Sequence, residues 1–360
     1  MAVTDFNAQL QAIVDDAGLP FVEIEAGGSS GGHLQFSHGA PVSELPAGEQ
    51  LCLVASITKS VVATLALKLV GEGQFSLSER VTDWLPELPT APFRRITIRH
   101  LLTHTCGLPD QLPGNTQLRS SHASLADFVV QIGENGTDYA PGSDCRYSSM
   151  GFLLLGEVIS RATRLPLPQA LQSHLFEPSE MNHSWLGIPK DRNDLLQIAV
   201  PSILPPWQND GIDWDWNSVY WRKLGAPWGG LLTTATDLGR LCRMILRNGV
   251  TEQGTRVLTA AAIEALTTEQ TRHLFDLPEK AWQKRPWGYG WRFAWPEHAA
   301  SFGDLVPRTA VGHWGATGTV FWLDREQQIY AVILTSTPFE QSRYALQRMS
   351  NVVASALTLP

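Results

Sequence analysis

Residues 51–71, LCLVASITKSVVATLALKLVG, decide the fold. An apolar run at helical spacing extends from Ser56 to Leu69, and Gly71 is a typical residue at the end of a helix. The sequence therefore predicts a helix that starts at Ser56. Lys59 follows three residues later, so the hydroxyl and the ammonium group are expected one turn apart on the same face of the helix.

A serine and a lysine placed in this way can act as a nucleophile and its base. The helix dipole favours negative charge at this end, and free N–H groups there can point at an oxyanion. The lysine can accept a proton only if its pKa falls well below about 10.4, which partial burial and a second cation would accomplish. From these four residues alone the alternative is equally good: Ser56 caps the helix and Lys59 is a solvated residue of the first turn.

The segments around this helix predict an α/β (α+β) protein with an antiparallel sheet. Helices are expected at residues 5–17 and 340–357, and strands at 21–25, 33–36, 287–295, 309–314, 318–323 and 329–335. Strand character nearly disappears between residues 76 and 239, where helices are expected at 97–105, 124–132, 150–163, 168–175 and 235–248. We therefore expect a discontinuous α/β domain, residues 1–75 together with 240–360, and a mostly helical domain, residues 76–239.

Composition narrows the classes of partner. The 360 residues are 43% hydrophobic and 17% charged, and 35 acidic against 27 basic side chains give a net charge of −8. Because the basic residues form no stripe, we expect no nucleic-acid partner and no membrane partner. No run of eighteen apolar residues and no leader pattern is visible, so we expect a soluble, cytoplasmic protein. The four cysteines lie far apart and predict neither disulfides nor a metal site.

Two further motifs contain residues that can take part in catalysis or substrate binding. Residues 141–149, PGSDCRYSS, place Tyr147 in a loop just before a predicted helix. A phenol that faces a nucleophile can relay a proton to a leaving group, although such a tyrosine is also a common half-buried packing residue. Residues 312–318, GHWGATG, form a strand rich in small residues that a substrate backbone can approach closely. Alone, His313 also fits an ordinary core histidine.

Taken together, in this order and spacing, the three motifs resemble the penicillin-recognising serine hydrolase superfamily. Its active site combines Ser-x-x-Lys, Tyr-x-Asn and a Lys/His-x-Gly strand. The chain is most similar to the class C β-lactamase-related branch, which includes family VIII carboxylesterases, D-amino peptide hydrolases and β-lactamases. Residues 96–108, ITIRHLLTHTCGL, and 228–238, WGGLLTTATDL, look like the same branch. The resemblance implies a β-lactamase/transpeptidase-like fold with its active site between the two domains.

The resemblance also implies roles for individual residues. Ser56 matches the acylated nucleophile, Lys59 its base and Tyr147 the proton relay. The backbone N–H groups of Ser56 and Ala316 match the oxyanion hole. The positions that match the substrate-binding residues of the family are Ser149, His313, Trp314 and Gly315.

Two departures from the family pattern bear on the substrate. Ser149 stands where the family usually has asparagine. In the third motif, His313 replaces the lysine of true β-lactamases, and Trp314 stands where threonine or serine would help to hold a substrate carboxylate. Both changes disfavour β-lactams and leave the acylation residues intact. We therefore expect a small-ester carboxylesterase that needs no cofactor or metal. The alternatives are a D-amino peptide or amide hydrolase, a weak β-lactamase, and a non-catalytic binding protein on the same fold.

Some residues allow two interpretations at this stage. Five tryptophans, Trp207, Trp214, Trp216, Trp221 and Trp228, fall in one short stretch and either pack the helical domain or line an acyl pocket. His100 and His104 are four residues apart on the helix expected at residues 97–105, and such a pair can ligate a metal. No third ligand is indicated, so a structural role is expected for both histidines.

Overall fold

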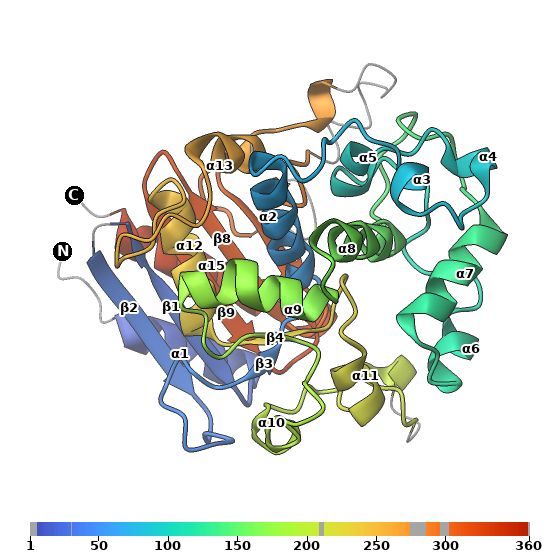
Figure 1. Ribbon diagram of the computed structural model, residues 1–360. Coiled ribbons are helices and arrows are strands. Elements are labelled where there is room, and N and C mark those ends of the chain that lie inside the picture. Colours follow the sequence, from blue (N-terminus) through green and yellow to red (C-terminus); the bar gives the residue numbers. More distant parts are fainter. Residues whose placement is uncertain (1–5, 30, 209–211, 274–285, 296–301, 359–360) are drawn as a thin grey trace.

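The computed structural model describes residues 6–29, 31–208, 212–273, 286–295 and 302–358. A six-stranded antiparallel sheet with the order β2-β1-β9-β8-β7-β6 occupies one side of the molecule, and most of the helices of residues 81–163 occupy the other (Figure 1). The strands are β1 (Val22–Gly28), β2 (Gly31–His38), β6 (Arg292–Phe293), β7 (Val311–Gly315), β8 (Thr319–Asp324) and β9 (Ile329–Thr335). The antiparallel α/β architecture expected from the sequence is confirmed.

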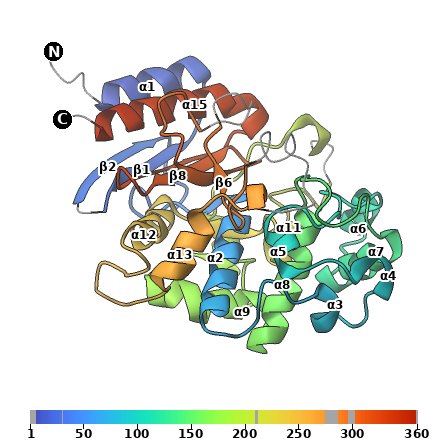
Figure 2. The ribbon, with the colours of Figure 1, turned by 90° about the horizontal axis from the view of Figure 1, so that it is seen from above.

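Helices cover both faces of this sheet. On one face α1 (Phe6–Ala17) and α15 (Phe339–Leu357) lie side by side, and Figure 2 shows α2 (Ile57–Gly71), α12 (Ala235–Leu246) and α13 (Ala260–Thr267) on the other. The face under α1 and α15 buries its own hydrophobic cluster, and a larger cluster runs from the opposite face through α2 into the helical part. The central helix α2 is therefore buried on all sides, as its nearly continuous apolar sequence requires.

The predicted extent of the strand at residues 287–295 is wrong, because the strand is shorter. Only Arg292 and Phe293 pair with β7, because Gly290, with φ +69°, bends the chain toward the helices. Its N–H donates to the carbonyl oxygen of Leu102, and a Cβ at Gly290 would lie 2.4 Å from the Cβ of Ala63. The bend therefore requires glycine and carries the preceding residues away from the sheet.

The helical part contains short elements. They are α3 (Val81–Trp84), α4 (Thr90–Phe93), α5 (Ile98–Leu102), α6 (Asn115–Ser120), α7 (Leu125–Asn135), α8 (Ser149–Thr163), α9 (Leu167–Leu171), α10 (Asp194–Ile198) and α11 (Val219–Leu224). Three strands that the sequence patterns did not predict, β3 (Cys52–Leu53), β4 (Trp185–Leu186) and β5 (Leu231–Thr233), form a second sheet in the order β3-β5-β4. None of the described helices is long and apolar enough to cross a membrane.

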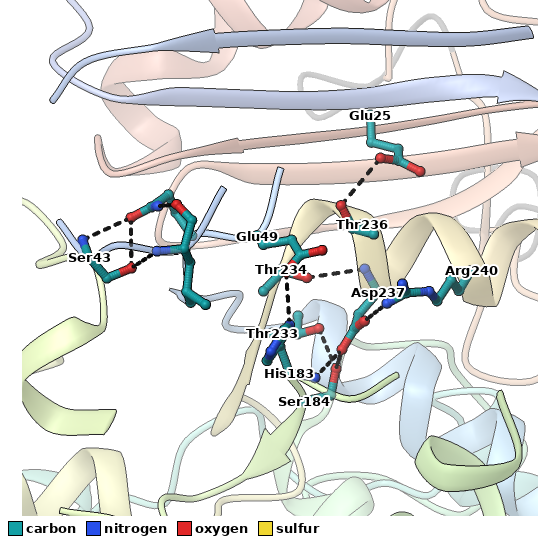
Figure 3. Close-up of polar contacts among 12 residues, drawn as sticks. Glu25, Ser43, Glu49, His183, Ser184, Thr233, Thr234, Thr236, Asp237 and Arg240 are labelled. Atoms are coloured by element: carbon teal, nitrogen blue, oxygen red, sulfur yellow. Dashed lines mark hydrogen bonds and ion pairs between the residues drawn. The ribbon is translucent and has the colours of Figure 1, made fainter. Parts of the chain in front are cut away.

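The second sheet is fastened to α12 by a buried carboxylate. Asp237 accepts hydrogen bonds from the backbone N–H of His183 at 2.7 Å, from Ser184 Oγ at 2.8 Å and from Arg240 at 2.6 Å (Figure 3). Thr234 caps the same helix by accepting from the N–H of Asp237. The domain boundary expected between residues 239 and 240 thus falls inside α12, which packs as one unit on β9 and β1.

Candidate active site

Ser56 lies at the junction between β3 and α2. Ala55 before it has a positive φ of 44°, so the chain turns sharply out of the strand before the helix begins. Ser56 occupies the N-cap position, but its side chain makes no capping hydrogen bond. Its Oγ instead accepts a hydrogen bond from Lys59 Nζ at 3.2 Å. The structure therefore leaves the hydroxyl free for chemistry, and the capping interpretation does not apply.

Lys59 is completely buried, not solvated. Its Nζ also donates to the carbonyl oxygen of Trp228 at 2.8 Å and lies 4.6 Å from the centre of the Tyr147 ring. Burial lowers the pKa of Lys59 to about 7, although the Asp110 carboxylate favours the charged form. Burial is thus the cause of the lowered pKa, and the second cation expected from the sequence does not contribute. A large fraction of Lys59 is neutral near neutral pH and can accept a proton from Ser56.

Tyr147 faces the same two groups from the loop before α8. Burial raises the pKa of its hydroxyl well above 10, Asp110 raises it further, and contact with the Ser56 hydroxyl opposes both. The ring packs against His104, with 4.7 Å between ring centres, and stacks on Trp287 at 5.9 Å. These contacts hold the ring in place. The raised pKa disfavours a stable phenolate, so the hydroxyl is suited to relay a proton.

The turn between β7 and β8 is tied to the residues before Ser56. Thr317 Oγ1 donates to the carbonyl oxygen of Leu53 at 2.7 Å, and Thr319 Oγ1 donates to that of Val54 at 3.1 Å. A Cβ at Gly315 would lie 2.2 Å from the same Val54 oxygen, so only glycine permits this approach. These contacts bring Ala316 and Ser56 to the wall of one cavity.

The amide groups at this junction can serve as an oxyanion hole. Within the described chain, the backbone N–H groups of Ser56 and Ala316 donate no turn or loop hydrogen bond. Two unpaired N–H donors beside the nucleophile suit a developing oxyanion.

The remaining predicted positions differ in what they contact. His313 is buried, and burial together with Lys59 lowers its pKa to about 3, so it is neutral at physiological pH. Trp314 stacks on Phe339, with 4.4 Å between ring centres. Ser149 is held by Asp110, which accepts from its Oγ at 2.5 Å and from its N–H at 3.1 Å. The Ser149 hydroxyl therefore points at a carboxylate of the protein.

Two cavities meet at Tyr147 and Trp314. The first, of about 380 Å³, contains Ser56 and Ala316, and we call it the tryptophan cavity because Trp207, Trp216, Trp221, Trp228 and Trp314 line it. The second, of about 340 Å³, we call the arginine cavity; it is lined by Arg146, Tyr147, Pro286, Trp287, Arg292, His313 and Trp314. Four of the five clustered tryptophans thus line a cavity, and Trp214 does not.

Sequence reasoning missed several residues of this site. Asp110, Arg119 and Arg292 line the cavities, and they carry no motif of their own. His104 was assigned a structural role; its Nδ1 accepts from the N–H of Ser148 at 3.1 Å, and its ring supports Tyr147. Among the described residues, no three His, Cys, Asp or Glu side chains are grouped as metal ligands would be.

Comparison with known proteins identifies the family of this chain. The Beta-lactamase family model matches residues 21–354. Penicillin-binding protein 4 of Amycolatopsis lactamdurans is 31% identical over 278 residues, which cover 74% of this chain and 66% of that protein. Esterase EstB of Burkholderia gladioli is 28% identical, with 84% of this chain and 80% of EstB covered. The solved structure of EstCE1, a hydrolase with promiscuous acyltransferase activity, has a TM-score of 0.76 at 18% identity and covers 97% of this chain and 98% of its own.

Proposed function

The chain belongs to the Beta-lactamase family of serine hydrolases, and we propose that it is a carboxylesterase for small esters that acts through an acyl-enzyme on Ser56. The observation that carries this proposal is the 3.2 Å contact between Ser56 Oγ and the fully buried Nζ of Lys59. It pairs a nucleophile with a base whose pKa lies near neutral pH.

The proposed reaction has two halves. Neutral Lys59 takes the proton of Ser56 as Oγ attacks the ester carbonyl, and the N–H groups of Ser56 and Ala316 stabilise the oxyanion. The ester C–O bond then breaks, and the proton passes from Lys59 through Tyr147 to the departing alkoxide, which leaves as alcohol. In the second half water attacks the acyl-enzyme, the same groups carry its proton to Ser56 Oγ, and the acid is released.

The contacts of Ser149 and Trp314 favour an ester over a β-lactam. The Ser149 hydroxyl donates to Asp110, and the Trp314 ring is stacked on Phe339. Neither side chain is therefore available to bind the amide or the carboxylate of a β-lactam, as the residues of the family pattern would. Ester acylation requires only the nucleophile, its base and the oxyanion donors, so it does not depend on those contacts.

A hydrolysis screen tests the proposal. Short-chain esters, D-amino amides and a chromogenic cephalosporin are compared by kcat/KM for the purified protein and for Ser56→Ala. We expect the esters to be turned over fastest, and only by the protein with Ser56. Faster turnover of an amide or a cephalosporin would assign the protein to one of those classes, and no turnover of any substrate would favour a non-catalytic binding protein.

A further inference from the structure

The tryptophan cavity contains a buried cation. Arg119, on α6, is only 5% exposed, and its guanidinium lies 4.2 Å from the centre of the Trp221 ring. Its Nε donates to Asn115 Oδ1 at 3.3 Å. No described carboxylate forms an ion pair with this guanidinium, and Asp110 attracts it only from a longer distance. Such a charge is costly to bury unless an anion is supplied from elsewhere.

Three tryptophans that line the same cavity also lack, within the described chain, a hydrogen-bond acceptor for their indole N–H groups. The side-chain N–H groups of Trp221, Trp228 and Trp314 are buried and have no hydrogen-bond partner among the described residues. The rings of Trp221 and Trp228 are in edge contact, with 6.2 Å between their centres. Arginine and tryptophan side chains only donate hydrogen bonds. Arg119, Trp221 and Trp228 therefore line the cavity with side chains that donate hydrogen bonds and accept none, while the acceptors Asp110 and Asn115 line other parts of it.

The groups around Arg119 leave it protonated at neutral pH. Asp110 and the Tyr220 hydroxyl are the groups that favour its charged form, while burial lowers its pKa to about 10. Arg119 is therefore a cation at neutral pH. Asp110, which lines the same cavity, accepts both hydrogen bonds from Ser149 through its Oδ1.

We propose that the wall formed by Arg119, Trp221 and Trp228 binds a carboxylate at the far end of the substrate's acyl chain. The favoured substrates are then monoesters of dicarboxylic acids, with the ester carbonyl at Ser56 and the free carboxylate at Arg119. This inference rests on the proposed acyl-enzyme at Ser56, because that residue opens into the same cavity. It assigns Arg119 as a specificity-determining residue.

Arg292 in the arginine cavity is the alternative site for the substrate's carboxylate. It is also buried, and among the described residues it has no acidic partner. Its cavity, however, contains neither Ser56 nor Ala316. The donor-only wall and the nucleophile share the tryptophan cavity, which favours Arg119 as the site for a carboxylate on the acyl chain.

The test compares matched pairs of ethyl esters. Monoethyl esters of dicarboxylic acids from succinate to suberate are compared with ethyl esters of monocarboxylic acids of equal chain length, and released ethanol is measured. For the unmodified protein we expect kcat/KM to favour the half ester by about tenfold or more at the best length. In Arg119→Gln this preference should fall by about ten- to a hundredfold, mainly through KM, as expected for the loss of a charge-assisted hydrogen bond.

Three further variants make the result decisive. Arg119→Lys keeps a cation and should retain most of the preference, which separates loss of charge from loss of folding. Arg348→Gln breaks a surface ion pair with Asp16 and should leave the preference unchanged. Loss of the preference in Arg292→Gln but not in Arg119→Gln would overturn the assignment. So would a protein that hydrolyses neutral esters through Ser56 and shows no preference for half esters; in that case the proposed esterase function would still stand.

Discussion

The two cavities that meet at Tyr147 and Trp314 are similar in size but differ in what they expose. The tryptophan cavity contains the nucleophile, the oxyanion donors and a mostly aromatic wall. The arginine cavity contains neither nucleophile nor oxyanion donor, and its polar groups are Arg146, Tyr147, Arg292 and His313.

This difference indicates a division of tasks. The tryptophan cavity is equipped to hold an acyl group, because large apolar rings surround a reactive hydroxyl. The arginine cavity shares Tyr147 with it, and we propose that it receives the departing alcohol. Each variant below alters one cavity or their shared wall, from the largest expected effect to the smallest.

Removal of the nucleophile should have the largest effect on activity. Ser56→Ala should lower kcat/KM for the best ester by at least about a thousandfold, because no other group can form the acyl-enzyme. The matched control is Ser60→Ala, one turn further along α2, where the hydroxyl donates to the carbonyl oxygen of Gly290. That variant should lose about 1 kcal/mol of stability and keep its activity within a few fold. Equal activities of the two variants would contradict the assignment.

Removal of the base should have nearly the same effect. Lys59→Met fills a similar volume without the amine, and we expect kcat/KM to fall by about a thousandfold, because Ser56 and Lys59 act as a unit. Lys68→Met on the same helix removes an exposed pairing with Glu72 and should be almost silent. If Lys59→Met keeps more than about a tenth of the activity, another group is the base.

A change in the shared wall should alter the choice between ester and β-lactam. Ser149→Asn combined with Trp314→Thr restores two side chains of the family pattern and should move the kcat/KM ratio about a hundredfold toward a cephalosporin. The single variant Ser149→Asn serves as the comparison, because Asp110 is still available to hold the new amide. An unchanged ratio in the double variant would show that cavity shape decides the preference.

A change confined to the arginine cavity should be mildest. The pKa of His313 is near 3, so the ring stays neutral from pH 5 to 9 and does not titrate with activity. We expect His313→Gln to lower kcat/KM less than about tenfold and to leave the pH profile in place. In the unmodified protein kcat/KM should rise as the pH passes about 7, because Lys59 must lose its proton to act as base. A profile that shifts in His313→Gln would make the imidazole part of the proton path.

The contrast between the cavities also explains what could be predicted from the sequence. Ser56 and Lys59 lie one turn apart on a single helix, and Tyr147, distant in sequence, was identified because its own short motif matches the resembled family. Asp110, Arg119 and Arg292 come from three separate segments, and only tertiary packing brings them to the site. No periodicity marks a charged residue that will become buried.

The fold shows the same limit. Strands β7, β8 and β9 were predicted within two residues because their apolar runs are long and bounded by turns. The segment before β6 has similar composition, yet the close approach of Gly290 to α2 bends it away from the sheet. Two- and three-residue strands such as β3, β4 and β5 depend on neighbours distant in sequence, and local patterns are too short to reveal them.

The central claim is that Ser56 is the nucleophile and that neutral Lys59 activates it. The most direct test is the rate at which a fluorophosphonate labels the protein, followed by intact mass and peptide mapping between pH 5 and 9. The account predicts one adduct per chain, on Ser56, with a rate constant that rises about tenfold per pH unit below pH 7 and levels off above it. An adduct on another residue, or a labelling rate on Ser56 that does not change with pH, would contradict it.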